Sequence, residues 1–488
     1  MPARLPVQNK TPFHLDPRPL DEMASPHAGL PAASRALRSL NLPGLVAANL
    51  QLKSRKRGFT EGQFVEAILL LQIAGGDCPE DVGIFREDTC LERGLGYALP
   101  KATAVREFLG RFHDATLAAT RPARETQKSF ILPGSAGVAG LQNVQAGLVR
   151  QAAKRYDQAG ERLKFATIDQ DATIIESHKE SALPHYDGGR GYQPMVAVWA
   201  EADLVVADEF RDGHVPAKQA PLGCAKLAFA ALPATITQRY FRGDSACHEN
   251  ELLDWLKHPD REQEPGGRIG FAVSAVLSEP LAEALRQVRE ADWQTFGKAE
   301  DGTLRQWAEV DFVPGDRSEH KASQPLRYVG LRLLKPQGVL FGDGSDRRFH
   351  AVVTNLKLAG GRLLDWHREK AGTVEHTHDE VKNELGGKHV PSQRFGVNAA
   401  WFKLSLLAYN LVSAIKGLCL APDERTARLK RFRLLLIQVA GRMNRNNCVM
   451  GLRLCNNNAA LKRMQKIWQV FALPTHATAA QPLRRRGG

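Results

Sequence analysis

The chain has 488 residues, of which 43% are hydrophobic and 24% charged, so it can bury a core and is too long for one ordinary domain. Its 66 Lys and Arg against 53 Asp and Glu give a net charge of +13, which favours a polyanionic partner such as nucleic acid. Seven scattered cysteines, none spaced C-x-x-C, argue against a zinc site or a disulfide framework. The N-terminus lacks an apolar signal core and no apolar run reaches about 18 residues, so we expect neither export nor a membrane span.

The first part of the chain is predicted to be helical after a polar arm. Residues 1–25 are polar and rich in proline, and we expect them to form a mobile arm. The segment FTEGQFVEAILLLQIAGG then opens with Thr60 and Gln63 at the spacing of a capping box. A second segment, PKATAVREFLGRFHDATLAAT, has apolar residues at helical spacing. Residues 26–155 are therefore predicted to form a helical N-terminal domain.

Residues 156–259 change to a pattern of strands and helices. The runs KFATIDQDATIIES, MVAVWAEADLVVADEF and TQRYFRGDSA are short, apolar and rich in residues that favour strands. A helical segment lies between the last two runs, and another, NELLDWLKH, follows them. Three consecutive strands, a helix, a strand and a helix are the order of a ribonuclease-H-like core. We therefore predict the first part of such an α/β core here.

The remaining segments complete the predicted organisation. Residues 260–361 hold four further apolar runs between Gly, Pro and charged turns, and most of this region is predicted to form strands. Residues 362–420 are predicted to form two helices, the second of them apolar on most sides and therefore buried. Residues 421–488 are expected to be a basic helical C-terminal region, in which DERTARLKRFRLLLIQVAGRMNRNN forms a basic amphipathic helix.

Acidic residues stand in or after predicted strands. Asp169 and Asp171 share one face of a strand, because side chains in a strand alternate between faces. Two carboxylates on one buried face repel each other unless a cation lies beside them. The alternative is one structural aspartate and one at the strand end. Asp244 follows a later strand, at the end where α/β sheets usually carry a site, although Asp before Ser is also an ordinary N-cap pair.

A third candidate acid, Glu375, lies on a charged face of a predicted helix. Arg368, His378 and Lys382 fall within about 60° of it at 100° per residue. A solvated charged face is the alternative, but the next predicted helix is buried, which makes burial near Glu375 plausible. Acids on the first strand, after a later strand and on this helix can bind two Mg²⁺ or Mn²⁺ ions, which prefer hard oxygen ligands and suit phosphodiester displacement.

These motifs together resemble the DDE transposases of bacterial insertion sequences, most closely the insertion-sequence-1380 group. The matching segments are DQDAT, GYQP, RGDS and REKAGTVEHTHDEVKNELG, and the resemblance covers residues 26–420. It implies a ribonuclease-H-like catalytic core interrupted by a β-rich insertion at 260–361. It also implies a metal-dependent enzyme that cuts DNA at transposon ends and joins the freed 3′-OH to target DNA.

The resemblance assigns roles to the acids. The family pattern Asp-x-Thr fits Asp171, Ala172 and Thr173, so Asp171 is expected to be the first catalytic acid. Asp244 is expected to be the second and Glu375 the third, and together they are expected to hold two Mg²⁺ or Mn²⁺ ions. Asp169 is a further candidate metal ligand.

The last helix departs from the pattern of the wider family. Glu375 and Lys382 keep their spacing, but Ala371 stands where the family has Arg, and Arg368 stands where it has Tyr. This departure leaves the roles of Arg368 and Lys370 open. Because the helix places them on the face of Glu375, we predict that Arg368, His378 and Lys382 contact DNA phosphates.

The resemblance also implies partners. We expect double-stranded DNA as the partner, both the terminal inverted repeats and the target, with the helical N-terminal domain binding the repeats. A homodimer that pairs two ends and a location in the bacterial cytoplasm, at the nucleoid, are further expectations. Trp293 and Trp307 in the insertion are candidates for stacking on an unpaired base, although core packing is the alternative that the sequence favours for both.

Two other functions remain open from the sequence. DQDAT also fits the D-x-D-x-T signature of haloacid-dehalogenase-like phosphatases, in which Asp169 would be the nucleophile and Asp171 the acid. Against this reading, His248 stands where a second metal-binding acid is expected, and Ile174 and Ile175 continue the strand instead of forming a turn. The other alternative is a catalytically inactive transposase relative that binds DNA.

Overall fold

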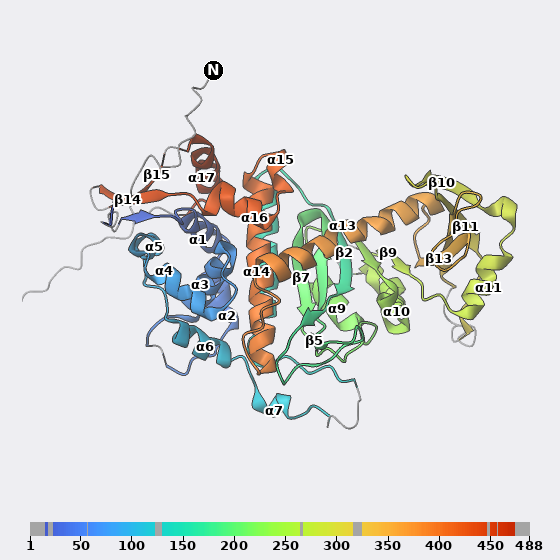
Figure 1. Ribbon diagram of the computed structural model, residues 1–488, viewed down its shortest axis with the longest axis horizontal. Coiled ribbons are helices and arrows are strands. Elements are labelled where there is room, and N and C mark those ends of the chain that lie inside the picture. Colours follow the sequence, from blue (N-terminus) through green and yellow to red (C-terminus); the bar gives the residue numbers. More distant parts are fainter. Residues whose placement is uncertain are drawn as a thin grey trace, which may run out of the picture.

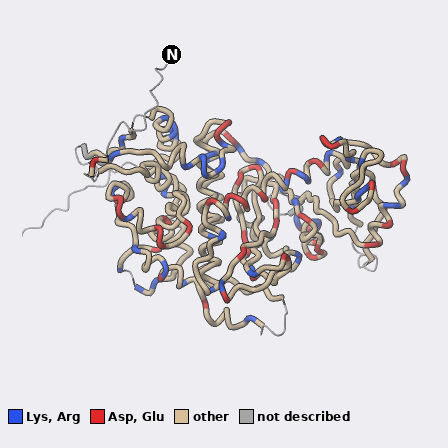
Figure 2. The backbone as a smooth tube through the Cα atoms, in the orientation of Figure 1, with Lys and Arg blue, Asp and Glu red and all other residues tan. Residues whose placement is uncertain are grey.

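The computed structural model describes residues 15–17, 23–55, 57–122, 129–263, 267–315, 325–446, 449–455 and 457–473. Figure 1 shows helices of the N-terminal part at one end, a sheet in the middle and a lobe of strands at the other end. The expected mobile arm at 1–25 lies mostly outside the described residues. Figure 2 shows Lys and Arg spread over all parts of the chain, with Asp and Glu between them.

The N-terminal part is helical in the described residues, as predicted. Its helices are α1 Leu30–Ser39, α2 Leu42–Asn49, α3 Glu61–Ala74, α4 Val82–Arg86, α5 Thr89–Leu95, α6 Ala102–Gly110, α7 Ala115–Ala118 and α8 Ala136–Gln158. The predicted capping box is present at the start of α3, where Thr60 and Gln63 bond each other's backbone N–H groups with their side chains. Gly75 ends α3 with a φ of 110°, a conformation that favours glycine.

A sheet of nine strands in the order β10-β11-β12-β13-β9-β8-β2-β6-β7 forms the centre. Its central strands are β2 Phe165–Ala172, β6 Met195–Trp199, β7 Leu204–Glu209, β8 Gln238–Gly243 and β9 Ile269–Ser274. β2 lies between β6, which is antiparallel to it, and β8, which is parallel. Helices α9 (Leu222–Ala231) and α10 (Asn250–Lys257) follow β7 and β8. Within the central sheet, the predicted order of three strands, a helix, a strand and a helix is therefore present.

The region 260–361 is rich in strands, as predicted, and it continues the central sheet. β9 pairs in parallel with β8, and an antiparallel series follows, comprising β10 Gln294–Lys298, β11 Leu304–Val310, β12 Arg327–Leu334 and β13 Arg347–Thr354. β13 returns to pair with β9, and α11 (Glu279–Gln287) precedes the series. A further small sheet consists of β3 Ile175–Glu176, β5 Arg190–Tyr192 and β4 Leu183–Pro184. The exact domain boundaries stay predictions.

Two long helices follow the strand-rich lobe. α13 (Gly360–Glu384) starts at this lobe and extends to the middle of the molecule, where it contacts β2. α14 (Phe395–Cys419) packs against α3, α8 and β7, between the N-terminal helices and the sheet. Among the described helices, α14 is long and apolar enough to span a membrane, but 94% of that stretch is buried inside the protein. Its composition therefore reflects a place in the core, as the sequence predicted.

The C-terminal region is helical only in part. It contains α15 Pro422–Arg425, α16 Leu429–Phe432, a π-helical turn Arg433–Ile437, a hairpin of β14 Gly441–Asn446 and β15 Val449–Leu454, and α17 Asn458–Val470. The prediction of one helix over residues 423–447 is wrong, because β1 (Ala24–Ser25) and β15 pair with β14 on either side. Gly441 permits this pairing, since a Cβ there would lie 2.6 Å from Cβ of Ala28.

Candidate active site

Asp169 is held in a buried ion pair. It faces Arg242 across the parallel pairing of β2 with β8, and the guanidinium donates to both of its carboxylate oxygens, at 2.7 and 2.8 Å. Thr373 on α13 donates its hydroxyl to the same carboxylate. The side chain of Asp169 is fully buried, so three donors compensate the loss of water around its charge.

Arg242 also fixes α13 against the sheet. Its third nitrogen donates to the carbonyl of Trp366 at 2.6 Å and to the carboxylate of Glu369 at 2.9 Å. Burial opposes the charge of Arg242, but the hydrogen bonds to Asp169 and Glu369 outweigh it and raise the pKa of this guanidinium. A permanently charged side chain therefore links β2, β8 and α13 at one point.

Asp171, two residues along β2, makes a different ion pair. Nζ of Lys370 on α13 lies 2.8 Å from Oδ2 of Asp171, whose other oxygen accepts the N–H of Ala172 at 2.8 Å. The side chain of Asp171 is 19% exposed, whereas that of Asp169 is 0% exposed, so only Asp171 retains access to solvent. Both aspartates point to α13, which confirms that they share one face of the strand.

Asp244 lies beside this pair at the end of β8. Burial and the charge of Asp171 raise the pKa of Asp244, while Lys370 acts in the opposite direction. Burial disfavours the charge of Lys370, but Asp171 and Asp244 together raise its pKa. The carboxylates of Asp171 and Asp244 and the ammonium group of Lys370 therefore affect one another's charge states.

The local backbone explains how Asp244 is placed. Oδ1 of Asp244 accepts the N–H of Ala246 at 3.1 Å and so caps a short 3₁₀ turn, Ser245–Cys247. At Gly243 a Cβ would lie 2.5 Å from Cβ of Cys247, so only glycine fits there. His367 on α13 bonds the carbonyl of Gly243 at 3.0 Å and fixes the turn to the helix.

Glu375 lies on the exposed side of α13 and lines the same cavity as Asp244 and Lys370. This cavity of about 850 Å³ lies between α13 and the strand-rich lobe. Arg368 also lines it, and the opposite wall includes Arg305 and Lys335. The cavity therefore joins Asp244 and Glu375 with basic residues from the 260–361 region.

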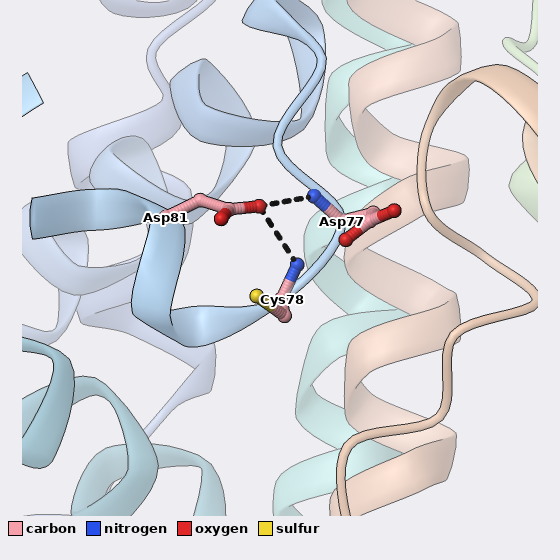
Figure 3. A group of neighbouring side chains, drawn as sticks. All are labelled: Asp77, Cys78 and Asp81. Carbon is pink, nitrogen blue, oxygen red and sulfur yellow. Dashed lines mark hydrogen bonds between the residues drawn. The ribbon is translucent and has the colours of Figure 1, made fainter. Parts of the chain in front are cut away.

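The three predicted acids do not form a compact cluster in this structure. Within the described part of the chain, one group of three potential metal-ligating side chains has its ligand atoms within 4.8 Å of one another. This group consists of Asp77, Cys78 and Asp81. In that group, Asp81 accepts the backbone N–H groups of Asp77 and Cys78 at 2.9 and 3.3 Å (Figure 3). These bonds cap a turn, so the geometry of the group has a structural explanation.

The predicted phosphate-binding residues differ in accessibility. Arg368 is exposed on the cavity wall. Nζ of Lys382 lies 3.4 Å from the carbonyl of Ile174, and burial lowers the pKa of Lys382. His378 is buried, which lowers its pKa to about 4, and its Nε2 has no hydrogen-bond partner among the described residues. His378 is therefore neutral near pH 7.

The two tryptophans pack inside the strand-rich lobe. Trp293 is 7% exposed and lies against Phe349 and the guanidinium of Arg332, whose carbon is 4.6 Å from its ring centre. Trp307 packs on the first turn of α13, where a Cβ at Gly360 would lie 2.1 Å from its ring. Both residues thus have a packing role that explains their presence.

Arg242, a neighbour of the candidate acids, was not predicted from the sequence, and Lys370 had no predicted role. A signal for Arg242 was present, because an arginine inside the apolar run TQRYFRG needs a buried anionic partner. Lys370 gave no comparable signal, since its position toward Asp171 depends on how α13 is rotated against β2.

A family model agrees with the sequence motifs. Residues 22–474 match the family model described as transposase DDE domain, group 1. The solved synaptic complex of piggyBac transposase with hairpin DNA also matches, with 10% sequence identity over 84% of this chain and 80% of that chain, at a TM-score of 0.41. No curated protein matches the sequence. The family match includes every residue of the candidate site.

Proposed function

The chain belongs to the group 1 family of transposase DDE domains, and on that premise we propose that it binds the ends of a mobile DNA element, cuts there and joins the 3′-OH to target DNA. The observation that carries the proposal is the convergence of Asp171 and Asp244 from neighbouring strands on Lys370, with Glu375 lining the same cavity. We assign Asp171, Asp244 and Glu375 as the catalytic acids.

The same three carboxylates are assigned as ligands of Mg²⁺ or Mn²⁺, two ions per site. The fit rests on the donor set, because all three are hard oxygen donors. Burial and the charge of Asp171 both raise the pKa of Asp244, as expected for neighbouring acids that need a cation between them. When bound, such ions would stabilise negative charge on the attacking and leaving oxygens of a phosphodiester displacement. Asp169 is assigned a structural role, because Arg242 and Thr373 occupy its oxygens.

The chain's own side chains position the DNA in this proposal. Arg368, exposed on the cavity wall, contacts a phosphate of the strand to be cut, and Lys382 contacts the same backbone further along α13. In the first step, a water oxygen bonds to phosphorus while the bond from phosphorus to the 3′-oxygen breaks; the water loses a proton and the leaving oxygen gains one, which gives a 5′-phosphate and a 3′-OH. In the second step, that 3′-oxygen loses its proton and bonds to a target phosphorus, while the bond from this phosphorus to the target's 3′-oxygen breaks and that oxygen leaves as a protonated 3′-OH. His378 receives no phosphate contact because it is buried and uncharged.

The fold supports this assignment. The central strands have the order β7-β6-β2-β8-β9, with β6 antiparallel to β2 and with β8 and β9 parallel. This order agrees with the one expected of a ribonuclease-H-like core, and we infer such a core, with the acids assigned to its first strand, to the end of its fourth strand and to a later helix. We assign the terminal repeats to the N-terminal helices. A homodimer pairs the two ends, and the protein acts at the bacterial nucleoid.

Cleavage of DNA that carries the element's terminal repeats, with and without Mg²⁺, tests the proposal. A transposase cuts this DNA at the repeat boundary only when Mg²⁺ or Mn²⁺ is present. An inactive relative retains the DNA without cutting it, and a phosphatase releases phosphate from a small ester instead. The phosphatase function is disfavoured because its nucleophile, Asp169, is fully buried in an ion pair. Either of these two results would overturn the proposed function.

A further inference from the structure

Lys370 forms an ion pair with Asp171, one of the three assigned acids. Its Nζ lies 2.8 Å from Oδ2 of Asp171, and its side chain is 9% exposed. The contact leaves Oδ2 of Asp171 directed at an ammonium group. A divalent ion that used this oxygen would be about 2 Å from it. Two cations cannot occupy one carboxylate oxygen at such distances without strong repulsion, because Lys370 and Asp171 are largely buried and poorly screened by solvent.

Two other basic groups nearby, Arg242 and His378, do not neutralise Asp171. Arg242 is engaged by Asp169, Glu369 and the carbonyl of Trp366, and His378 is neutral. Lys370, by contrast, is held mainly by the charges of Asp171 and Asp244. Its long side chain adjoins the cavity of about 850 Å³, which leaves room for the ammonium group to move away from Asp171 while its backbone stays in α13.

We propose that Lys370 is a resident counter-cation, which occupies Asp171 and must be displaced before a divalent ion binds there. This inference rests on the proposed role of Asp171 as a metal ligand. Lys370 neutralises the repulsion between Asp171 and Asp244 and at the same time weakens the affinity of the site for metal. On displacement its ammonium group enters the cavity, where the proposed function places the DNA phosphates. Lys370 is therefore a positioning residue that restrains metal binding until DNA is present.

The test is a titration of the full-length protein with Mn²⁺ in the absence of DNA. The concentration of free Mn²⁺ is measured by electron paramagnetic resonance. Lys370→Met removes the charge and retains most of the volume of the side chain. The Kd of this variant for Mn²⁺ is expected to fall roughly tenfold, because a largely buried competing charge is lost. Lys370→Arg retains the charge and is expected to bind as weakly as the wild type. Lys388→Met is the matched control, because Lys388 is an exposed lysine whose ammonium group bonds Asn383.

A second measurement separates this inference from the proposed function. Asp171→Asn is expected to weaken Mn²⁺ binding. If it does, and Lys370→Met binds Mn²⁺ no more tightly than the wild type, the counter-cation role is overturned while the metal site stands. If Asp171→Asn leaves Mn²⁺ binding unchanged, the proposed metal site itself fails, and the role of Lys370 fails with it. Circular dichroism checks the fold of each variant, and Lys370→Gln replaces Lys370→Met if the latter is unfolded.

Discussion

Arg242 on β8 binds both carboxylate oxygens of Asp169 on the neighbouring strand β2, at 2.7 and 2.8 Å. Because of this contact, the two aspartates of the DQD segment have different roles. Asp169 and Arg242 neutralise each other in the core and hold α13 through Glu369 and Trp366. Asp171 is partly exposed and close to Asp244, and it is therefore the aspartate that we assign to catalysis.

The structural role of Asp169 is open to a stability measurement. Asp169→Ala leaves the buried charge of Arg242 without its main partner, which is expected to lower the free energy of unfolding by about 3–5 kcal/mol. Urea denaturation measures this loss. Glu283→Ala, which removes an exposed partner of Arg286 on α11, is the control and is expected to lose at most about 1 kcal/mol. A loss for Asp169→Ala as small as that of the control would contradict the assignment.

The raised pKa of Asp244 predicts that this residue destabilises the metal-free protein at neutral pH. A carboxyl group whose pKa is higher in the folded state stabilises that state below its unfolded pKa, near 3.8, and this stabilisation is lost as the pH rises through the folded value. Asp244→Asn keeps an oxygen to cap the turn at Ala246 and cannot ionise. It is therefore expected to be more stable than the wild type at pH 7.

The pH dependence provides the check on that prediction. Thermal unfolding in a chelating buffer is compared for the wild type and Asp244→Asn from pH 7 to pH 3. The advantage of the variant should shrink as the pH falls and disappear below about 3.8, where both side chains are neutral. A constant difference across this range, or a less stable variant at pH 7, would show that ionisation of Asp244 is not disfavoured by its surroundings.

Two glycines near the acids are expected to respond oppositely to alanine. Gly243→Ala places a Cβ 2.5 Å from Cβ of Cys247, so the turn that holds Asp244 must shift, and we expect a loss of about 1–3 kcal/mol together with loss of DNA cleavage. Gly372→Ala on α13 meets no atom within 4 Å and should stabilise the helix by up to about 1 kcal/mol. Urea denaturation and the cleavage assay measure both effects, and equal effects of the two variants would refute the packing argument.

Much of the fold follows from local sequence patterns. The capping box at Thr60 and Gln63, the β-rich runs around Asp169 and Asp171, and the apolar pattern of α14 each predict the element that the structure contains. The hairpin at Gly441 was missed because its strands exist through pairing with a distant N-terminal segment. A basic amphipathic pattern alone predicts a helix there.

The candidate site could be predicted only in part for a similar reason. Strand alternation correctly places Asp169 and Asp171 on one face, but it does not say which of them meets an arginine. That depends on the register of β2 against β8, which pairs Asp169 with Arg242. The contact of Lys370 with Asp171 likewise depends on the rotation of α13. Both contacts join residues far apart in sequence, and neither leaves a local pattern.

DNA cleavage by single-residue variants decides whether Asp171, Asp244 and Glu375 are the catalytic acids. The substrate is DNA carrying the element's terminal repeats, in Mg²⁺, with DNA retention measured in parallel. Asp379→Asn is the matched control, because Asp379 lies one turn after Glu375 and pairs with Arg428 instead. We predict that Asp171→Asn, Asp244→Asn and Glu375→Gln each abolish cleavage and still bind the DNA, whereas Asp379→Asn cuts normally. Normal cleavage by any of the first three would contradict the account and remove that residue from the site.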